Sequence, residues 1–137
     1  MVDEAIRYLT KLIRLPGEAQ QIDRILEKFA RSYHIQNPTL SFTAEALYIL
    51  FFSLIMLNTD LHNKSIATSR KMTLEQYISN LRGINSGSNV SKQLLTSLYN
   101  RIKNNPLVMN DEDMYESPYV EFMAPAKVSY AFYKCNI

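Results

Sequence analysis

A glutamate directly after a Pro-Gly pair is the side chain best placed for chemistry in this 137-residue sequence. Pro16 and Gly17 break the chain, and Glu18 then opens an amphipathic segment. A carboxylate in the first turn of a helix is also favoured by the helix dipole, so a structural role explains Glu18 as well. The residue types alone leave both interpretations open.

A second candidate for chemistry is the pair Asp60 and His62, which could support proton transfer. A polar network at a helix end explains the pair with fewer assumptions. With one cysteine and two histidines, the sequence has no spacing typical of a metal site. It also has no glycine-rich phosphate loop. We therefore expect no hydrolase or transferase chemistry, no metal and no cofactor.

The charges and the apolar segments limit the remaining classes of partner. The formal net charge is only +2, and the basic residues lack interleaved aromatics, which favours a solvated surface over nucleic-acid binding. The charged N-terminus is unlike a signal peptide. The longest apolar run, 46–57, is short for a bilayer span and indicates a buried helix. We expect a cytoplasmic protein with no membrane segment in this chain.

Apolar residues at helical spacing predict an all-α domain over 1–110. Asp3 is a candidate N-cap for a first helix with the apolar face Ile6, Leu9, Leu12 and Ile13. The third segment is apolar nearly all round, which is typical of a core helix. The predicted helices span 3–13, 18–34, 43–57, 73–83 and 91–105.

Two further features concern the fourth helix and the end of the chain. Thr73 and Gln76 have the spacing of a capping box, and Gly83 is a candidate end for that helix. Residues 111–137 are acidic and aromatic, and we expect an irregular tail in which 128–133 could extend as a strand.

Three segments in order resemble the signatures of the Sec-seven domain family, the exchange factors for ARF GTPases. They are residues 15–24, residues 55–63, and residues 82–85 with the leucines that follow them. The resemblance implies the active-site half of an elongated, right-handed, all-helical stack. The family's N-terminal helices have no counterpart in this chain. The implied partner is an ARF-family small GTPase, GDP-bound or nucleotide-free.

The resemblance also implies roles for individual residues. Glu18 would enter the nucleotide site and expel GDP without covalent chemistry, so the protein would not be an enzyme in that sense. Asn63 would hold its loop or contact the GTPase backbone. The residues implied in GTPase binding are Ile22, Asp23, Glu45, Phe52, Ile55, Met56 and Asn58.

Each of these assignments has a structural alternative. Core packing competes with the groove role of the apolar residues, and surface solvation competes with the role of the two acids as a charged rim. For the chain as a whole, the alternative is a truncated fragment that binds an ARF GTPase weakly or without catalysing exchange. Any attachment to Golgi or endosomal membranes would come through parts that this chain does not contain.

Overall fold

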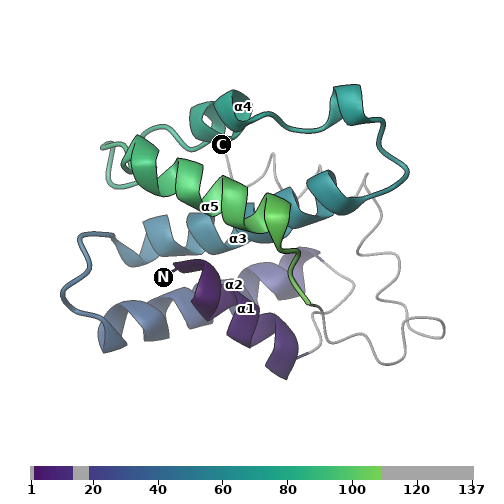
Figure 1. Ribbon diagram of the computed structural model, residues 1–137. Helices are drawn as coiled ribbons and strands as arrows, with labels where there is room; N and C mark the ends of the chain where they lie inside the picture. The colour runs from purple at the N-terminus through teal and green to yellow at the C-terminus, as the bar shows by residue number, and fades with distance from the viewer. Residues whose placement is uncertain (1, 14–18, 109–137) are drawn as a thin grey trace.

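The computed structural model describes residues 2–13 and 19–108, and these residues form an all-α fold (Figure 1). The α-helical class is confirmed, and no strand occurs within the described ranges. The predicted tail over 111–137, with its possible strand at 128–133, lies outside them. The elements are α1 (Val2–Leu12), α2 (Ala19–Gln36), α3 (Ala44–His62), the short 3-10 helix η1 (Thr68–Arg70), α4 (Leu74–Asn80) and α5 (Lys92–Asn104).

Helix α3 is the centre of the fold. It packs against α2, α5 and α1, and Figure 1 shows it running between α2 and α5. Every residue from 50 to 59 is buried. A helix that is apolar all round must be covered on all sides, so the predicted core role of this segment is confirmed.

By length and composition alone, α3 could also cross a membrane, with a mean hydropathy of 1.4 over its most apolar window. Of that window, 67% is buried inside the fold. The core helix of a soluble protein gives the same pattern. The apolar run 46–57 is shorter than α3, because the helix also includes the polar residues that follow the run.

The predicted end of α3 at Leu57 is wrong, since the helix continues to His62. The polar residues after Leu57 indicated a turn, but their side chains have partners that allow the helix to continue. Asn58 Oδ1 accepts a hydrogen bond of 2.8 Å from the backbone of Leu107. Thr59 Oγ1 donates to the Ile55 carbonyl at 3.2 Å.

The capping box before α4 is confirmed. Thr73 Oγ1 accepts from the Gln76 amide at 3.2 Å, and Gln76 Oε1 accepts from the Thr73 amide at 2.9 Å. These two bonds satisfy donors that the first turn of a helix leaves open. The helix ends at Asn80, before the predicted Gly83. Gly83 lies in the turn that follows, with a φ of +69° that favours glycine.

Two predictions for α1 are wrong. Asp3 lies inside the helix and is buried, so it is not the N-cap. Of the predicted apolar face, Ile6 and Leu9 are buried, but Leu12 is 57% exposed. Tyr8 is exposed one turn before Leu12. The covered face of α1 therefore looks toward α3 and α5, and Tyr8 and Leu12 lie on the other side.

Candidate functional site

Glu18, the first predicted site residue, lies outside the described residues, together with the turn before it. The description resumes at Ala19, where α2 begins. The position of the Glu18 side chain therefore stays a prediction. The other predicted site residues lie on α2, on α3 and in the turn that ends α3.

Asp23, in the second turn of α2, is joined to α3. The Tyr48 hydroxyl donates a hydrogen bond of 2.8 Å to Asp23 Oδ1. The Tyr48 ring also packs against Phe52, with 6.2 Å between the ring centroids. Two predicted contact residues, one on each helix, are thus brought together by a tyrosine that the sequence analysis did not single out.

The four apolar residues predicted to line a groove are all buried: Ile22, Phe52, Ile55 and Met56. The most accessible of them, Met56, is 7% exposed. Their burial fits core packing, which was the alternative to the groove role. A partner could contact them only after the atoms that cover them move, and the groove role stays a prediction.

The predicted polar contact residues lie near the two ends of α3. Glu45 is exposed in the first turn, where the helix dipole favours a carboxylate. Asn58 is buried near the other end and is already bonded to Leu107. The structure thus brings Asn58 toward the segment after α5, away from Glu45.

Asn63 forms the turn that ends α3. Its amide donates to the Thr59 carbonyl at 3.0 Å, and its Oδ1 accepts from the Ser65 amide at 2.8 Å. Its carbonyl accepts from the Ile66 amide at 3.2 Å. An asparagine bonded to the backbone two residues on is a common turn device, and here it fixes the direction of the chain after α3.

Asp60 and His62 do not bond to each other in the described structure. Asp60 Oδ2 accepts from the Met72 amide at 2.6 Å. His62 Nε2 lies 2.8 Å from the Ile102 carbonyl, which can only accept, so this nitrogen carries the proton. The interpretation as a polar network at a helix end is correct, and each side chain holds a different segment against α3.

Asn85, in the third family-like segment, holds the start of α3. Its Oδ1 accepts from the Thr43 amide at 3.1 Å, and its Nδ2 donates to the Ser41 carbonyl at 3.1 Å. The two bonds fix the residues before α3, where Thr43 Oγ1 caps the helix by accepting from Ala46. Asn85 was not among the predicted site residues, and its place in residues 82–85 is its signal in the sequence.

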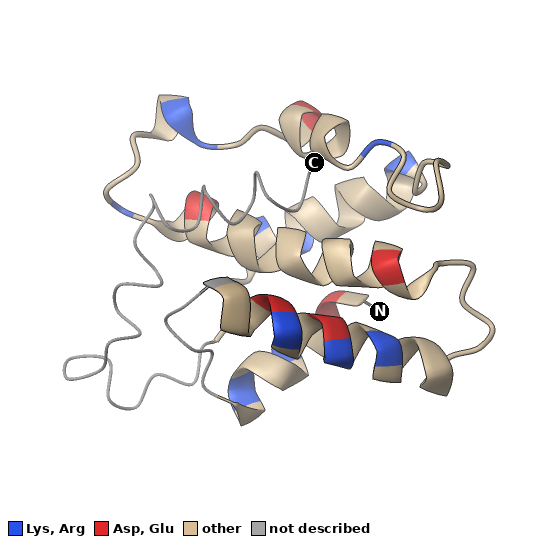
Figure 2. Cartoon of the chain, turned by 180° about the vertical axis from the view of Figure 1, so that it is seen from behind, with Lys and Arg blue, Asp and Glu red and all other residues tan. Residues whose placement is uncertain are grey.

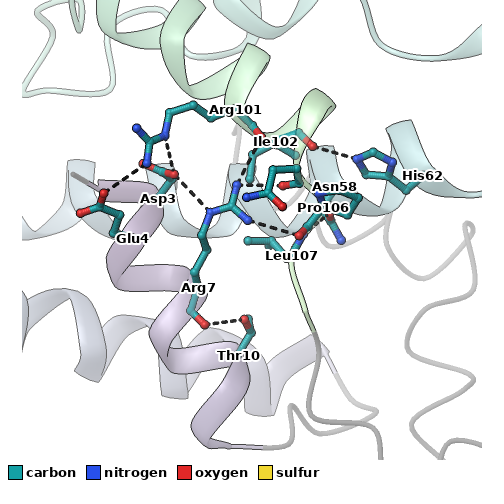
Figure 3. A network of polar contacts seen from close by, with 11 residues as sticks. Asp3, Glu4, Arg7, Thr10, Asn58, His62, Arg101, Ile102, Pro106 and Leu107 are labelled. Carbon is teal, nitrogen blue, oxygen red and sulfur yellow. Dashed lines mark hydrogen bonds and ion pairs between the residues drawn. The ribbon is translucent and has the colours of Figure 1, made fainter.

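A cluster of charged residues joins the two ends of the described fold (Figure 3). Asp3 Oδ2 accepts from Arg101 at 2.7 Å and from Arg7 at 3.2 Å. The Arg7 guanidinium also donates to the carbonyls of Asn105 and Pro106. The hydrogen bond to Asp3 and the charge of Asp3 raise the pKa of Arg101 above its ordinary value. The sequence offers only the spacing of Asp3 and Arg7 as a signal for this cluster.

A hollow of about 420 Å³ lies beside this cluster. None of the predicted site residues line it. It is lined by Arg7, Ser97, Asn100, Arg101, Asn104 and Asn105. Its two arginines are both bonded to Asp3, and Arg101 is also bonded to Glu4, so two carboxylates balance the two positive charges.

The outer face of α2 carries charges of both signs, and Figure 2 shows basic and acidic residues interleaved along this helix. One exposed pair, Arg31 and Glu27, lies at 2.7 Å. Exposed pairs of this kind contribute little to stability. Among the described residues, no group of three His, Cys, Asp or Glu could hold a metal ion.

The all-α order of the helices agrees with the fold that the three segments implied. The family model described as the Sec7 domain matches residues 1–107. The chain therefore belongs to the Sec7 domain family.

Two curated relatives match over most of the chain. Brefeldin A-inhibited guanine nucleotide-exchange protein 2 of Arabidopsis thaliana is 45% identical over 82% of this chain and 6% of its own length. Human cytohesin-3 is 43% identical over 80% of this chain and 27% of its own length. The chain thus spans only a small part of these relatives.

Solved structures show the same fold. The N-terminal Sec7 domain of RalF superimposes with a TM-score of 0.73 at 45% identity, over 80% of this chain and 54% of that one. A structure of ARF1-GDP bound to a Sec7 domain complexed with brefeldin A matches with a TM-score of 0.69 at 40% identity. The match covers 82% of this chain and 56% of that one.

Proposed function

We propose that this chain promotes the release of GDP from an ARF-family GTPase, with Glu18 as the acting carboxylate. The observation that carries the proposal is the Sec7 match over 1–107, because it contains residues 15–24 and the turn at Asn63 together. Relatives at more than 40% identity are named as nucleotide-exchange proteins, and one solved Sec7 domain is bound to ARF1-GDP.

The mechanism follows from charge. A GTPase holds the β-phosphate of GDP with a lysine and Mg²⁺. A carboxylate inserted beside this phosphate repels it, competes for the lysine and disfavours the metal ion. Two like charges ~4 Å apart at an effective dielectric constant of ~20 repel by about 4 kcal/mol. This corresponds to GDP binding that is weaker on the order of a thousandfold. No covalent bond forms or breaks in this chain.

The remaining residues would bind the GTPase. Asn63 would present its side chain from the turn that ends α3, and Asp23 and Glu45 would offer carboxylates at the rim. Asn58 and the apolar residues Ile22, Phe52, Ile55 and Met56 would support the contact surface from the interior. The partner would be met in the cytoplasm or at Golgi or endosomal membranes.

The test is Glu18→Lys, which places a cation where the proposal needs an anion. We expect the wild-type chain to accelerate the release of fluorescent GDP from an ARF GTPase. The variant should lose this activity and still bind the GDP-bound GTPase in a pull-down. Glu27→Lys is the matched control, because it makes the same charge change at an exposed position of α2. Full activity in Glu18→Lys would refute the role of Glu18.

A second candidate function is GTPase binding without exchange. It is favoured by the extent of the match, since the chain covers only 54% of the solved Sec7 domain of RalF. If exchange depends on the remainder of that domain, the wild-type chain binds the GTPase and leaves GDP release unchanged. The two assays above separate this outcome from the first.

A further inference from the structure

A lysine eleven residues along the chain from Asp60 reaches back to the end of α3. Lys71 Nζ lies 2.6 Å from the Leu61 carbonyl, 3.1 Å from the Asn63 carbonyl and 3.4 Å from the Asp60 carbonyl. One ammonium group therefore faces three carbonyls at the C-terminal end of α3.

This arrangement suits the chemistry of a helix end. The last carbonyls of an α-helix have no partner within the helix, and they carry a partial negative charge. An ammonium group has three donors and no acceptor, so it can bond several of these carbonyls at once. Lys71 is half-buried, which reduces the competition from water for these bonds.

The residue after Lys71 is bonded to two helices. The Met72 amide donates to Asp60 Oδ2 at 2.6 Å, which joins the segment to α3. The Tyr99 hydroxyl donates to the Met72 carbonyl at 2.7 Å, which joins it to α5. The backbone next to Lys71 is therefore held by α3 and α5, while the Lys71 side chain contacts the turn that ends α3.

The Asn63 carbonyl accepts from both Lys71 Nζ and the Ile66 amide. With the Asn63 amide bonded to Thr59, both peptide groups of Asn63 are fixed. The orientation of these two peptide planes sets the direction in which the Asn63 side chain leaves the backbone. Lys71 thus acts on the geometry of Asn63 without belonging to its turn.

We infer that Lys71 is a positioning residue for the GTPase contact made by Asn63. This inference rests on the proposed function for its activity readout. Removing the ammonium group leaves the Asn63 carbonyl with only the bond from the Ile66 amide. The turn is then held less firmly, so GDP release slows while the core stays folded.

The test compares Lys71→Met, which keeps the length of the side chain, with Lys64→Met, the same change at an exposed lysine next to Asn63. Lys71→Met should lower kcat/KM for the release of fluorescent GDP from an ARF GTPase by about tenfold, as expected for the loss of a charge-assisted hydrogen bond. Lys64→Met should leave it unchanged. A thermal melt by circular dichroism checks that both variants keep their helices.

A double-mutant cycle separates positioning from a general structural role. If Lys71 acts through Asn63, Lys71→Met together with Asn63→Ala loses no more activity than Asn63→Ala alone. If the two losses multiply, Lys71 acts elsewhere and the inference is wrong.

Amide hydrogen exchange gives a readout that is independent of GTPase activity. In Lys71→Met, the amides of Ser65 and Ile66 should exchange at least tenfold faster than in the wild type, because both bond to Asn63. Unchanged protection overturns the inference whatever the release assay gives. Faster exchange in a chain whose wild type releases no GDP supports the positioning of Asn63 and refutes the proposed function alone.

Discussion

Asp3 offers a sharp test of how the charged cluster at the two ends of the fold contributes to stability. Its side chain is 0% exposed and accepts from Arg101 at 2.7 Å and Arg7 at 3.2 Å. Asp3→Ala removes both bonds. It leaves Arg7 bonded to backbone carbonyls and Arg101 bonded to Glu4, so neither arginine becomes an isolated buried charge.

The expected loss can be estimated from these contacts. A hydrogen bond to a charged group contributes roughly 1.5–3 kcal/mol. Arg101 is 40% exposed, so water screens its bond to Asp3 and the upper end of that range is too high. We expect Asp3→Ala to lower the free energy of unfolding by about 2 kcal/mol. With a urea m value of roughly 1–2 kcal/mol/M, the midpoint moves down by about 1–2 M.

The assay is urea unfolding of the whole chain followed by circular dichroism. Glu4→Ala is the control, because Glu4 is 64% exposed and bonds the same Arg101 at 3.2 Å. Its midpoint should stay close to that of the wild type, because water screens an exposed ion pair. If Asp3→Ala changes the midpoint no more than Glu4→Ala does, the bonds of Asp3 do not stabilise the fold as proposed.

Two further predictions concern α3. Asn85→Ala should lower the free energy of unfolding by about 1–2 kcal/mol, because it removes the bonds to Thr43 and Ser41; a stable variant in the same urea assay would contradict this. Met56→Asp should lose most of the helical circular dichroism signal, because Met56 is 7% exposed and an unpaired buried carboxylate costs several kcal/mol. If Met56→Asp keeps its helices and loses only affinity for the GTPase, Met56 lines an accessible groove.

Local patterns predicted the helices well where the partners of a residue are close in sequence. The bonds between Thr73 and Gln76 span three residues, so the spacing alone reveals them. The apolar character of α3 likewise requires burial whatever surrounds it. The all-α class follows from these short-range signals.

Long-range contacts explain the wrong predictions for the end of α3 and for Asp3. The helix continues past Leu57 because Asn58 bonds to Leu107, forty-nine residues away. Asp3 is buried because Arg101, ninety-eight residues away, neutralises it. No periodicity reports such partners, since they become neighbours only after the chain has folded.

The same difference between short-range and long-range contacts applies to the candidate site. The resemblance named Asn63 and Asp23, but the contacts that hold them, from Lys71 and Tyr48, are visible only in three dimensions.

The charged cluster at Asp3 also determines where the polypeptide enters and leaves this unit. Arg7 in the first helix bonds to the carbonyls of Asn105 and Pro106, so the two ends of the described fold lie side by side (Figure 3). A folded unit with adjacent ends can be inserted into a longer polypeptide without forcing the flanking segments apart.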